Sequence, residues 1–189
     1  MQYNSPVILT FFLLSLGVLF LGQYTGGWTT THLFSVYRSS LKDPLFYIRL
    51  FGHVPGHASW DHFFGNIMML LVVGPLLEEK YGSANILFVT LTTALVTGVI
   101  NFIFFPHVQL LGASGVVFAF ILLASLTSIE EEKIPLTFIL VALIYIGQQV
   151  YDGIFIRDNV SNLTHILGGI VGSGLGYVMN KNKMDRYCR

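Results

Sequence analysis

The sequence predicts an all-α membrane protein built from six transmembrane helices, and three observations support that class. Of the 189 residues, 53% are hydrophobic and only 11% are charged, whereas soluble domains carry roughly a quarter charged residues. Mean hydropathy is +0.68. The few charges gather in short runs between long apolar stretches. Water therefore cannot be the main solvent of this chain.

Six apolar stretches approach the ~20 residues that a helix needs to cross a bilayer. In chain order they are residues 7–24, 61–79, 84–105, 113–129, 134–152 and 163–180. No Lys or Arg precedes the first stretch and no convincing cleavage site follows it, so we interpret it as a retained helix. Charged runs at 78–80 and 130–133 separate neighbouring stretches. The whole chain is expected to form one membrane domain, residues 1–189.

The connection between the first two predicted helices, residues 25–60, is too long for a simple turn and too mixed to span a bilayer. It combines several aromatic side chains with Arg38, Lys42 and Arg49. Aromatic and basic residues together are typical of segments at the bilayer surface. We therefore expect a partly membrane-embedded loop.

Charge also indicates the orientation in the membrane. Lys181, Lys183, Arg186 and Arg189 follow the last predicted helix, so the positive-inside rule places the C-terminus in the cytoplasm. Six spans bring the N-terminus to the same side, and the aromatic loop then faces the outside. A compact chain of this kind is consistent with a bacterial plasma membrane.

The net charge and the cysteine count exclude two other kinds of feature, a nucleic-acid partner and a cysteine-based site. The formal net charge is zero, which argues against nucleic acid because no basic surface exists to neutralise phosphates. The single cysteine, Cys188, excludes an intramolecular disulfide and a cysteine-rich metal site.

Polar residues at membrane depth indicate where function resides, because their burial is costly. His62 and Asn66 begin the second predicted helix, Ser114 begins the fourth and His165 begins the sixth. Even-numbered helices all enter the membrane from the outer face. These four side chains therefore lie at similar depth and are able to meet.

Glycines indicate how closely the helices approach one another. His165, Gly168 and Gly172 are spaced i, i+3 and i+7 and share one helical face. Gly176 extends a small-residue ridge that admits another helix backbone. Small residues also surround Ser114. The pattern predicts a Ser–His pair across a close helix contact.

A serine–histidine pair is suited to nucleophilic catalysis. Neutral imidazole can take the proton of a serine hydroxyl, which is otherwise a poor nucleophile. The resulting oxyanion needs hydrogen-bond donors, and the candidates are the Asn66 amide, the His62 ring and the Ser114 backbone N–H. The outer parts of these helices hold no acid other than Asp61. We therefore expect a dyad without a third member.

Three motifs occur in chain order: His53-x3-His57-x4-His62-x3-Asn66 followed by Glu78, then Gly112-Ala113-Ser114-Gly115, then His165-x2-Gly168-x3-Gly172. From about Arg49 to Gly176 the chain resembles the rhomboid intramembrane serine proteases. The resemblance implies a six-helix rhomboid core with Ser114 as nucleophile, His165 as base, and His62 and Asn66 at the oxyanion. It implies that the fifth helix and the loop after it form a substrate gate and cap, so that movement of either admits substrate. No cofactor is expected.

The resemblance also implies structural roles for a second set of residues. Glu78 is expected to pin the inner end of the second helix, and Gly112, Gly115, Gly168 and Gly172 are expected to support the site. Arg49 matches the arginine of a Trp-Arg pair in the family's first loop, but Ile48 stands where the tryptophan is expected.

The sequence therefore predicts an intramembrane serine endopeptidase acting on transmembrane protein substrates within the lipid bilayer. The alternative is a catalytically silent rhomboid-like protein that binds membrane proteins or serves their quality control. A metal site formed by His53, His57 and His62 is disfavoured because no HExxH motif is present. A transporter is disfavoured because no repeat halves are evident.

Overall fold

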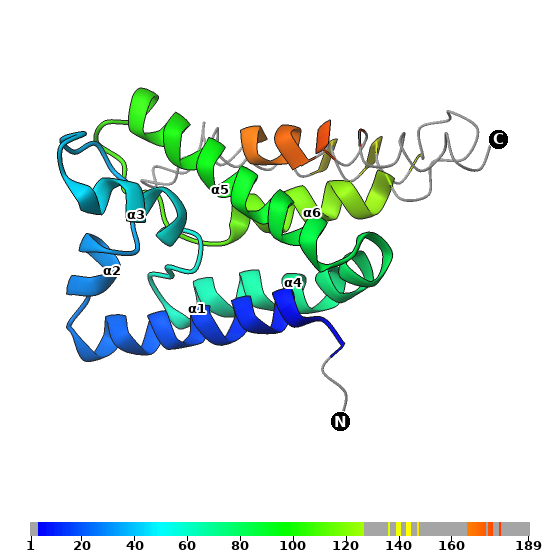
Figure 1. Ribbon diagram of the computed structural model, residues 1–189, viewed down its shortest axis with the longest axis horizontal. Helices are drawn as coiled ribbons and strands as arrows, with labels where there is room; N and C mark the ends of the chain where they lie inside the picture. The colour runs from blue at the N-terminus through cyan, green and yellow to red at the C-terminus, as the bar shows by residue number, and fades with distance from the viewer. Residues whose placement is uncertain are drawn as a thin grey trace.

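The computed structural model describes residues 4–126 and, beyond them, 136, 139–140, 143–144, 147, 166–172, 174–175 and 178. In the first of these ranges the chain is mainly helical (Figure 1). Its helices are α1 (Pro6–Tyr24), α2 (Trp28–His32), α3 (Pro44–Gly52), α4 (Trp60–Tyr81), α5 (Ser83–Phe104) and α6 (Ser114–Leu126).

Three of these helices, α1, α4 and α5, are long and apolar enough to cross a membrane, with 19, 22 and 22 residues. They agree with the first three predicted spans to within two residues at each end. The described part of α6 has 13 residues. Most of the predicted fifth span, 134–152, lies outside the described residues. Residues 166–172 of the predicted sixth span are helical.

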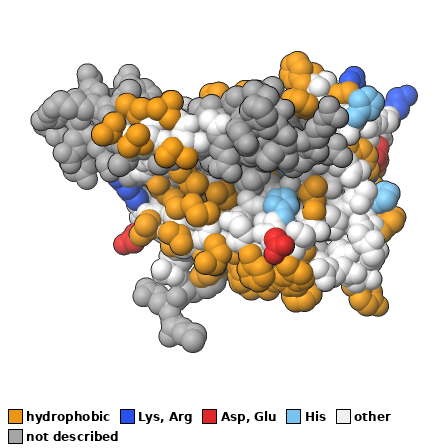
Figure 2. All heavy atoms as spheres, turned by 180° about the vertical axis from the view of Figure 1, so that it is seen from behind, with side chains coloured by type: hydrophobic (Ala, Val, Ile, Leu, Met, Phe, Trp, Pro, Cys, Tyr) orange, Lys and Arg blue, Asp and Glu red, His pale blue; other side chains and the backbone are white. Residues whose placement is uncertain are grey.

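The helices are apolar on their outer faces as well as in the core. The core between α1, α4, α5 and α6 includes buried Phe63, Ile86, Phe120 and Leu123. Large hydrophobic side chains are also exposed along α1, α4 and α5. Figure 2 shows hydrophobic side chains spread over the described face with few charges among them. A helix that is apolar all round requires an apolar environment, as expected of an integral membrane protein.

Helices α1 and α4 run antiparallel in close contact. A Cβ built on Gly74, near the end of α4, would lie 2.6 Å from Cδ1 of Ile8, near the start of α1. Glycine is therefore needed at this crossing. The same pairing of a helix start with a helix end brings Glu78 of α4 beside the first turn of α1.

The buried carboxylate of Glu78 joins three helices, and we call this set of contacts the Glu78 clamp. Oε1 accepts from the Val7 backbone N–H at 2.9 Å, and Oε2 accepts from the Ile8 N–H at 3.1 Å. The Ser83 hydroxyl at the start of α5 donates to Oε1 at 2.7 Å. A negative charge at a helix N-terminus also interacts favourably with the helix dipole. The clamp therefore fixes the start of α1, the end of α4 and the start of α5.

We expect Glu78→Ala to lower the free energy of unfolding by about 2–3 kcal/mol, because it leaves the part-buried Val7 N–H and the buried Ile8 N–H without an acceptor. Thermal unfolding in detergent measures the loss. Glu79→Ala is the matched control, since the neighbouring Glu79 side chain is exposed. Equal stability of the two variants would contradict a structural role for the clamp.

Candidate active site

The starts of α4 and α6 adjoin each other. The Ser59 hydroxyl caps α4 by accepting from the His62 backbone N–H at 3.2 Å. The His62 ring then lies against Gly112, where a Cβ would come within 2.6 Å of Nε2. Gly112 has φ +114, a backbone conformation that favours glycine. Two residues later Ser114 begins α6, so the predicted serine and the His62 ring share one end of the bundle.

Asn66 lies one turn after His62 on α4, and its side chain is buried. Its Nδ2 donates to the His62 backbone carbonyl at 2.9 Å. A side-chain amide carries two N–H groups, so this bond uses one of them. The bond fixes the direction of the amide relative to the His62 turn.

The helical segment 166–172 packs directly on α6 through its glycines. A Cβ on Gly168 would lie 3.3 Å from the Gly115 Cα, and one on Gly172 would lie 2.5 Å from the Ala119 Cα. Both contacts advance in the same direction along the chain, so the two segments run parallel, side by side (Figure 1). Gly168 and Gly172 therefore permit contact between the two backbones. His165 itself lies outside the described residues.

A small cavity of about 10 Å³ adjoins the start of α6. Its lining includes Ser114, His53 of the 25–60 segment and Thr97 of α5. This volume is comparable to the space that one water molecule requires. The Ser114 end of α6 is thus a junction of several elements.

His53 is buried and makes hydrogen bonds to α3, to α5 and to the loop before α6. Its Nδ1 donates to the Arg49 carbonyl at 3.1 Å, and its Nε2 lies 3.3 Å from the Thr97 hydroxyl. Its backbone carbonyl accepts from the Gly112 N–H at 2.9 Å. Burial lowers the pKa of His53 to about 4, so the ring is neutral at neutral pH. His53 therefore links the loop before Ser114 to α3 and α5.

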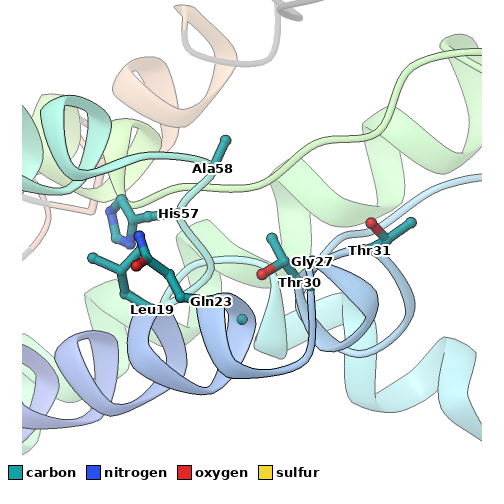
Figure 3. Close-up of a pocket in the computed structure, with 9 residues that line it drawn as sticks. Leu19, Gln23, Gly27, Thr30, Thr31, His57 and Ala58 are labelled. Carbon is teal, nitrogen blue, oxygen red and sulfur yellow. The ribbon is translucent and has the colours of Figure 1, made fainter.

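His57 lies between His62 and a cavity of about 500 Å³ near the end of α1 (Figure 3). Its Nδ1 donates to the Pro55 carbonyl at 3.0 Å, and its ring centroid is 5.1 Å from that of His62. Burial, followed by the proximity of His62, lowers the pKa of His57 to about 4. Leu19, Gln23 and Thr30 also line the cavity. No group of three or more metal-ligating side chains occurs within the described part of the chain.

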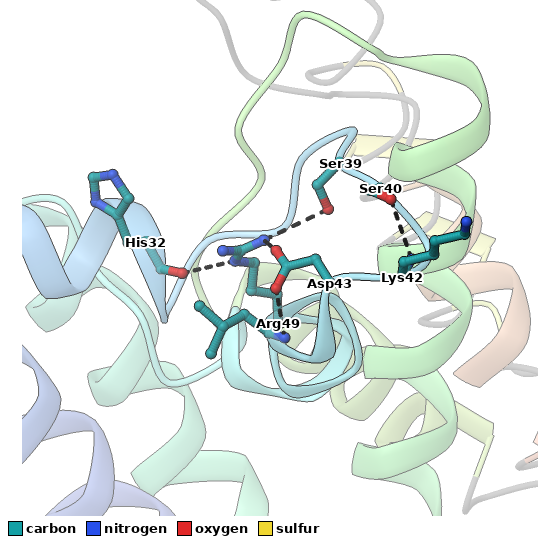
Figure 4. A network of polar contacts seen from close by, with 7 residues as sticks. His32, Ser39, Ser40, Lys42, Asp43 and Arg49 are labelled. Carbon is teal, nitrogen blue, oxygen red and sulfur yellow. Dashed lines mark hydrogen bonds and ion pairs between the residues drawn. The ribbon is translucent and has the colours of Figure 1, made fainter.

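Arg49 organises the segment that carries these histidines (Figure 4). Its Nε donates to the His32 carbonyl at 2.7 Å, and Nη1 pairs with Asp43 Oδ2 at 3.0 Å. The guanidinium also lies 4.6 Å from the Tyr37 ring centroid. Ile48, at the position expected to hold tryptophan, is exposed. Arg49 is thus anchored by its own neighbours without an aromatic residue at position 48.

Thr93, Thr97 and Asn101 form a buried polar stripe on α5 that was not among the residues predicted from the sequence. They recur every fourth residue along the helix and so share one face. The Asn101 amide donates to the Val36 and Val108 carbonyls, each at 3.1 Å. The helical spacing of these polar residues within an apolar helix is the signal that could have identified them. The site predicted from the sequence used residues of the second, fourth and sixth spans only, whereas α5 is the third span.

Comparison with known proteins identifies the family of the chain. The family model described as the Rhomboid domain matches residues 45–182. Rhomboid-related protein 2 of Mus musculus is 30% identical over 143 residues, which cover 69% of this chain and 47% of the mouse protein. Rhomboid-related protein 1 of Caenorhabditis elegans is 27% identical over 138 residues, covering 68% of this chain and 39% of its own.

A bacterial protein is also similar. Rhomboid protease GluP of Bacillus subtilis (strain 168) is 27% identical over 179 residues, which cover 89% of this chain and 34% of that protein. The aligned region therefore spans less than half the length of each of these three curated relatives.

We expect Gly172→Ala to destabilise the protein by about 1–3 kcal/mol, because the added methyl group would overlap Ala119 of α6. Gly174→Ala is the control. A Cβ there meets no atom within 4 Å, and alanine favours a helix over glycine by up to about 1 kcal/mol. Thermal unfolding in detergent should therefore separate the two variants. Similar melting temperatures would contradict the close contact between 166–172 and α6.

The buried histidines predict that the protein loses stability in acid. The pKa values of His53 and His57 are about 4 in the folded protein, against 6.5 for an unperturbed imidazole. Between these values the unfolded chain binds protons that the folded one does not. The free energy of unfolding should therefore fall as pH drops from about 6.5 toward about 4.

This dependence is measured by the melting temperature across that pH range in wild type and His57→Gln. The variant should show the shallower decline because it lacks one of the two groups. Parallel curves for the two proteins would mean that His57 is not buried in its neutral form.

Proposed function

This chain belongs to the rhomboid family, and we propose that it is an intramembrane serine endopeptidase that hydrolyses a peptide bond in or near a substrate's transmembrane segment. The observation that carries the proposal is the contact of Gly168 with Gly115. Gly115 directly follows Ser114, and Gly168 lies three residues after His165. A helix that continues back to His165 would bring the imidazole beside the serine hydroxyl.

The environment of Ser114 supports its role as nucleophile. It is the first residue of α6, where the positive end of the helix dipole favours developing negative charge. It also adjoins the small cavity lined by His53 and Thr97. The Gly115 contact allows the backbone of 166–172 to approach without a side chain in between.

The proposed reaction has two halves. His165 takes the Ser114 proton as the serine oxygen attacks the substrate carbonyl, and it then returns that proton to the leaving amine. His165 next removes a proton from water, which attacks the acyl-enzyme and releases the acid with regeneration of Ser114. In both halves the oxyanion would accept hydrogen bonds from the Ser114 N–H, the His62 ring and Asn66.

Other predicted features complete the proposal. Six transmembrane helices would enclose the site, with both termini in the cytoplasm and the active site toward the outer face. Movement of the fifth helix or of the loop after it would admit a transmembrane substrate. No cofactor takes part in the two half-reactions. The relatives named above include one called a protease, and a bacterial plasma membrane is the proposed location.

Cleavage of a generic single-span protein in liposomes tests the role of Ser114. We expect Ser114→Ala to reduce the cleavage rate at least ~1,000-fold, because no other group replaces the nucleophile. Ser125→Ala is the matched control on the same helix, since the Ser125 hydroxyl donates to the Ile121 carbonyl within α6. An unchanged melting temperature shows that the Ser114 variant is folded.

His165→Ala should cause a similar loss, because the serine then lacks its base. Normal turnover in that variant would remove His165 from the mechanism. Equal cleavage by wild type and Ser114→Ala would identify a different nucleophile or a contaminant. Folded wild-type protein that binds transmembrane substrates and cleaves none of a panel would favour the silent, binding alternative.

A further inference from the structure

His57 is a buried histidine to which the proposed reaction gives no role, yet it contacts a histidine that the reaction does use. Its side chain is 1% exposed. Its ring meets the His62 ring edge to face, with the centroids 5.1 Å apart and the planes at 68°. It meets the ring of Phe63, the next residue of α4, in the same way, at 5.4 Å and 85°. His57 therefore packs against the first turn of α4 in a geometry that aromatic rings prefer.

The loop that carries His57 holds its ring in a fixed direction. The ring Nδ1 donates to the Pro55 carbonyl at 3.0 Å, and proline restricts the backbone at that position. The Gly56 N–H donates to the His53 carbonyl at 3.1 Å. A Cβ on Gly56 would overlap the Phe34 carbonyl, so this turn packs directly on another part of the 25–60 segment. His57 is thus a rigid support for whatever it touches.

The His62 ring needs such a support. Its backbone N–H donates to the Ser59 hydroxyl, but that bond fixes the start of the helix and leaves the ring free to turn. Rotation of an imidazole about χ2 has only broad energy minima. No hydrogen bond to another described residue restrains the ring. Two contacts do restrain it: the His57 ring, and Gly112, where a Cβ would lie 2.6 Å from the His62 Nε2.

The His57 ring also separates His62 from open space. His57 lines the cavity of about 500 Å³ near the end of α1, together with Leu19 and Gln23 (Figure 3). Without the His57 ring, the His62 ring would gain room to turn toward this cavity and away from Gly112. A donor stabilises an oxyanion only from a hydrogen-bonding distance of about 2.7–3.1 Å. Such a rotation would therefore remove the His62 N–H from the oxyanion.

We infer that His57 is a positioning residue for oxyanion stabilisation, because it holds the His62 ring against Gly112, two residues before Ser114. His57 does not itself donate to the oxyanion and acts through His62 alone. This inference rests on the proposed function, in which His62 is one of the oxyanion donors. The contribution belongs to the transition state, so its loss lowers kcat and leaves KM nearly unchanged.

Two substitutions at position 57 separate the ring contact from the hydrogen bond. The amide of an asparagine can replace Nδ1 as donor to the Pro55 carbonyl, so His57→Asn keeps that bond and removes the ring beside His62. His57→Phe keeps a ring and removes the donor. His32→Asn is the matched control. The His32 Nδ1 likewise donates to a backbone carbonyl, that of Trp28 at 2.9 Å, and its ring stacks on Trp28 at 4.8 Å.

Cleavage of a single-span protein in liposomes gives kcat and KM for each variant. We expect His57→Asn to lower kcat at least ~10-fold with KM changed by less than about twofold. His57→Phe should retain a higher kcat than His57→Asn, and His32→Asn should match wild type. In a His62→Ala background, His57→Asn should cause no further loss, because the ring that His57 holds is already gone. A residue that only stabilises the fold would lower activity by the same factor in both backgrounds.

NMR of protein containing isotope-labelled histidine examines the His62 ring without catalysis. The chain has six histidines, and the ring signals of His62 are identified by their disappearance in His62→Ala. In detergent, His57→Asn should shift and broaden these signals, because the ring then samples several orientations. His32→Asn should leave them unchanged. Melting temperatures establish that each variant is folded.

Three results overturn this inference and leave the proposed function standing: wild-type kcat in folded His57→Asn, equal losses in the wild-type and His62→Ala backgrounds, or a lower kcat for His57→Phe than for His57→Asn. Unchanged His62 ring signals in His57→Asn overturn it as well. Absence of cleavage by wild type overturns the proposed function and this inference together. If His57→Asn does not fold, His57→Gln, which also lacks the ring, is measured in its place.

Discussion

The fold depends on hydrogen bonds that buried polar groups make inside the protein, because a surrounding bilayer offers no water to replace them. Three of these groups join elements that are distant in sequence. Glu78 accepts from the start of α1 and the start of α5. Asn101 donates to Val36 and Val108, and His53 connects α3 with α5. Hydrophobic packing alone discriminates poorly between helix arrangements in lipid, so these directional contacts define which helices meet and in what register.

The candidate site lies at the end of the bundle where most of these links converge. The strand-like pairing of Val36 with Leu110 and the hydrogen bond from Gly112 to His53 tie the chain before α6 to the 25–60 segment. That segment is itself held by Arg49. The position of Ser114 is therefore determined by residues that take no part in the proposed chemistry. Precise placement of reacting groups by a rigid surrounding shell is a general requirement of catalysis.

The sequence predicted the first three long helices and a common depth for His62, Asn66 and Ser114, since apolar length and helix parity follow directly from the bilayer. It also predicted close approach through Gly168 and Gly172, because glycine spacing identifies a backbone contact. The partners of Arg49 and the stripe at Thr93, Thr97 and Asn101 were not predicted. Those contacts depend on how an irregular loop folds against α5, which no local pattern encodes. The position of His165 and the six-span count stay predictions.

The Glu78 clamp has a consequence for biogenesis. The amides of Val7 and Ile8 meet a carboxylate that lies 71 and 70 residues later in the chain. When α1 first enters the membrane, its leading N–H groups have headgroups and water as their only acceptors. They exchange those acceptors for Glu78 after α4 has crossed the bilayer, and Ser83 adds its bond as α5 begins. Helix α1 thus enters the membrane first, but it can pack against α4 and α5 through Glu78 only after those two helices have been translated.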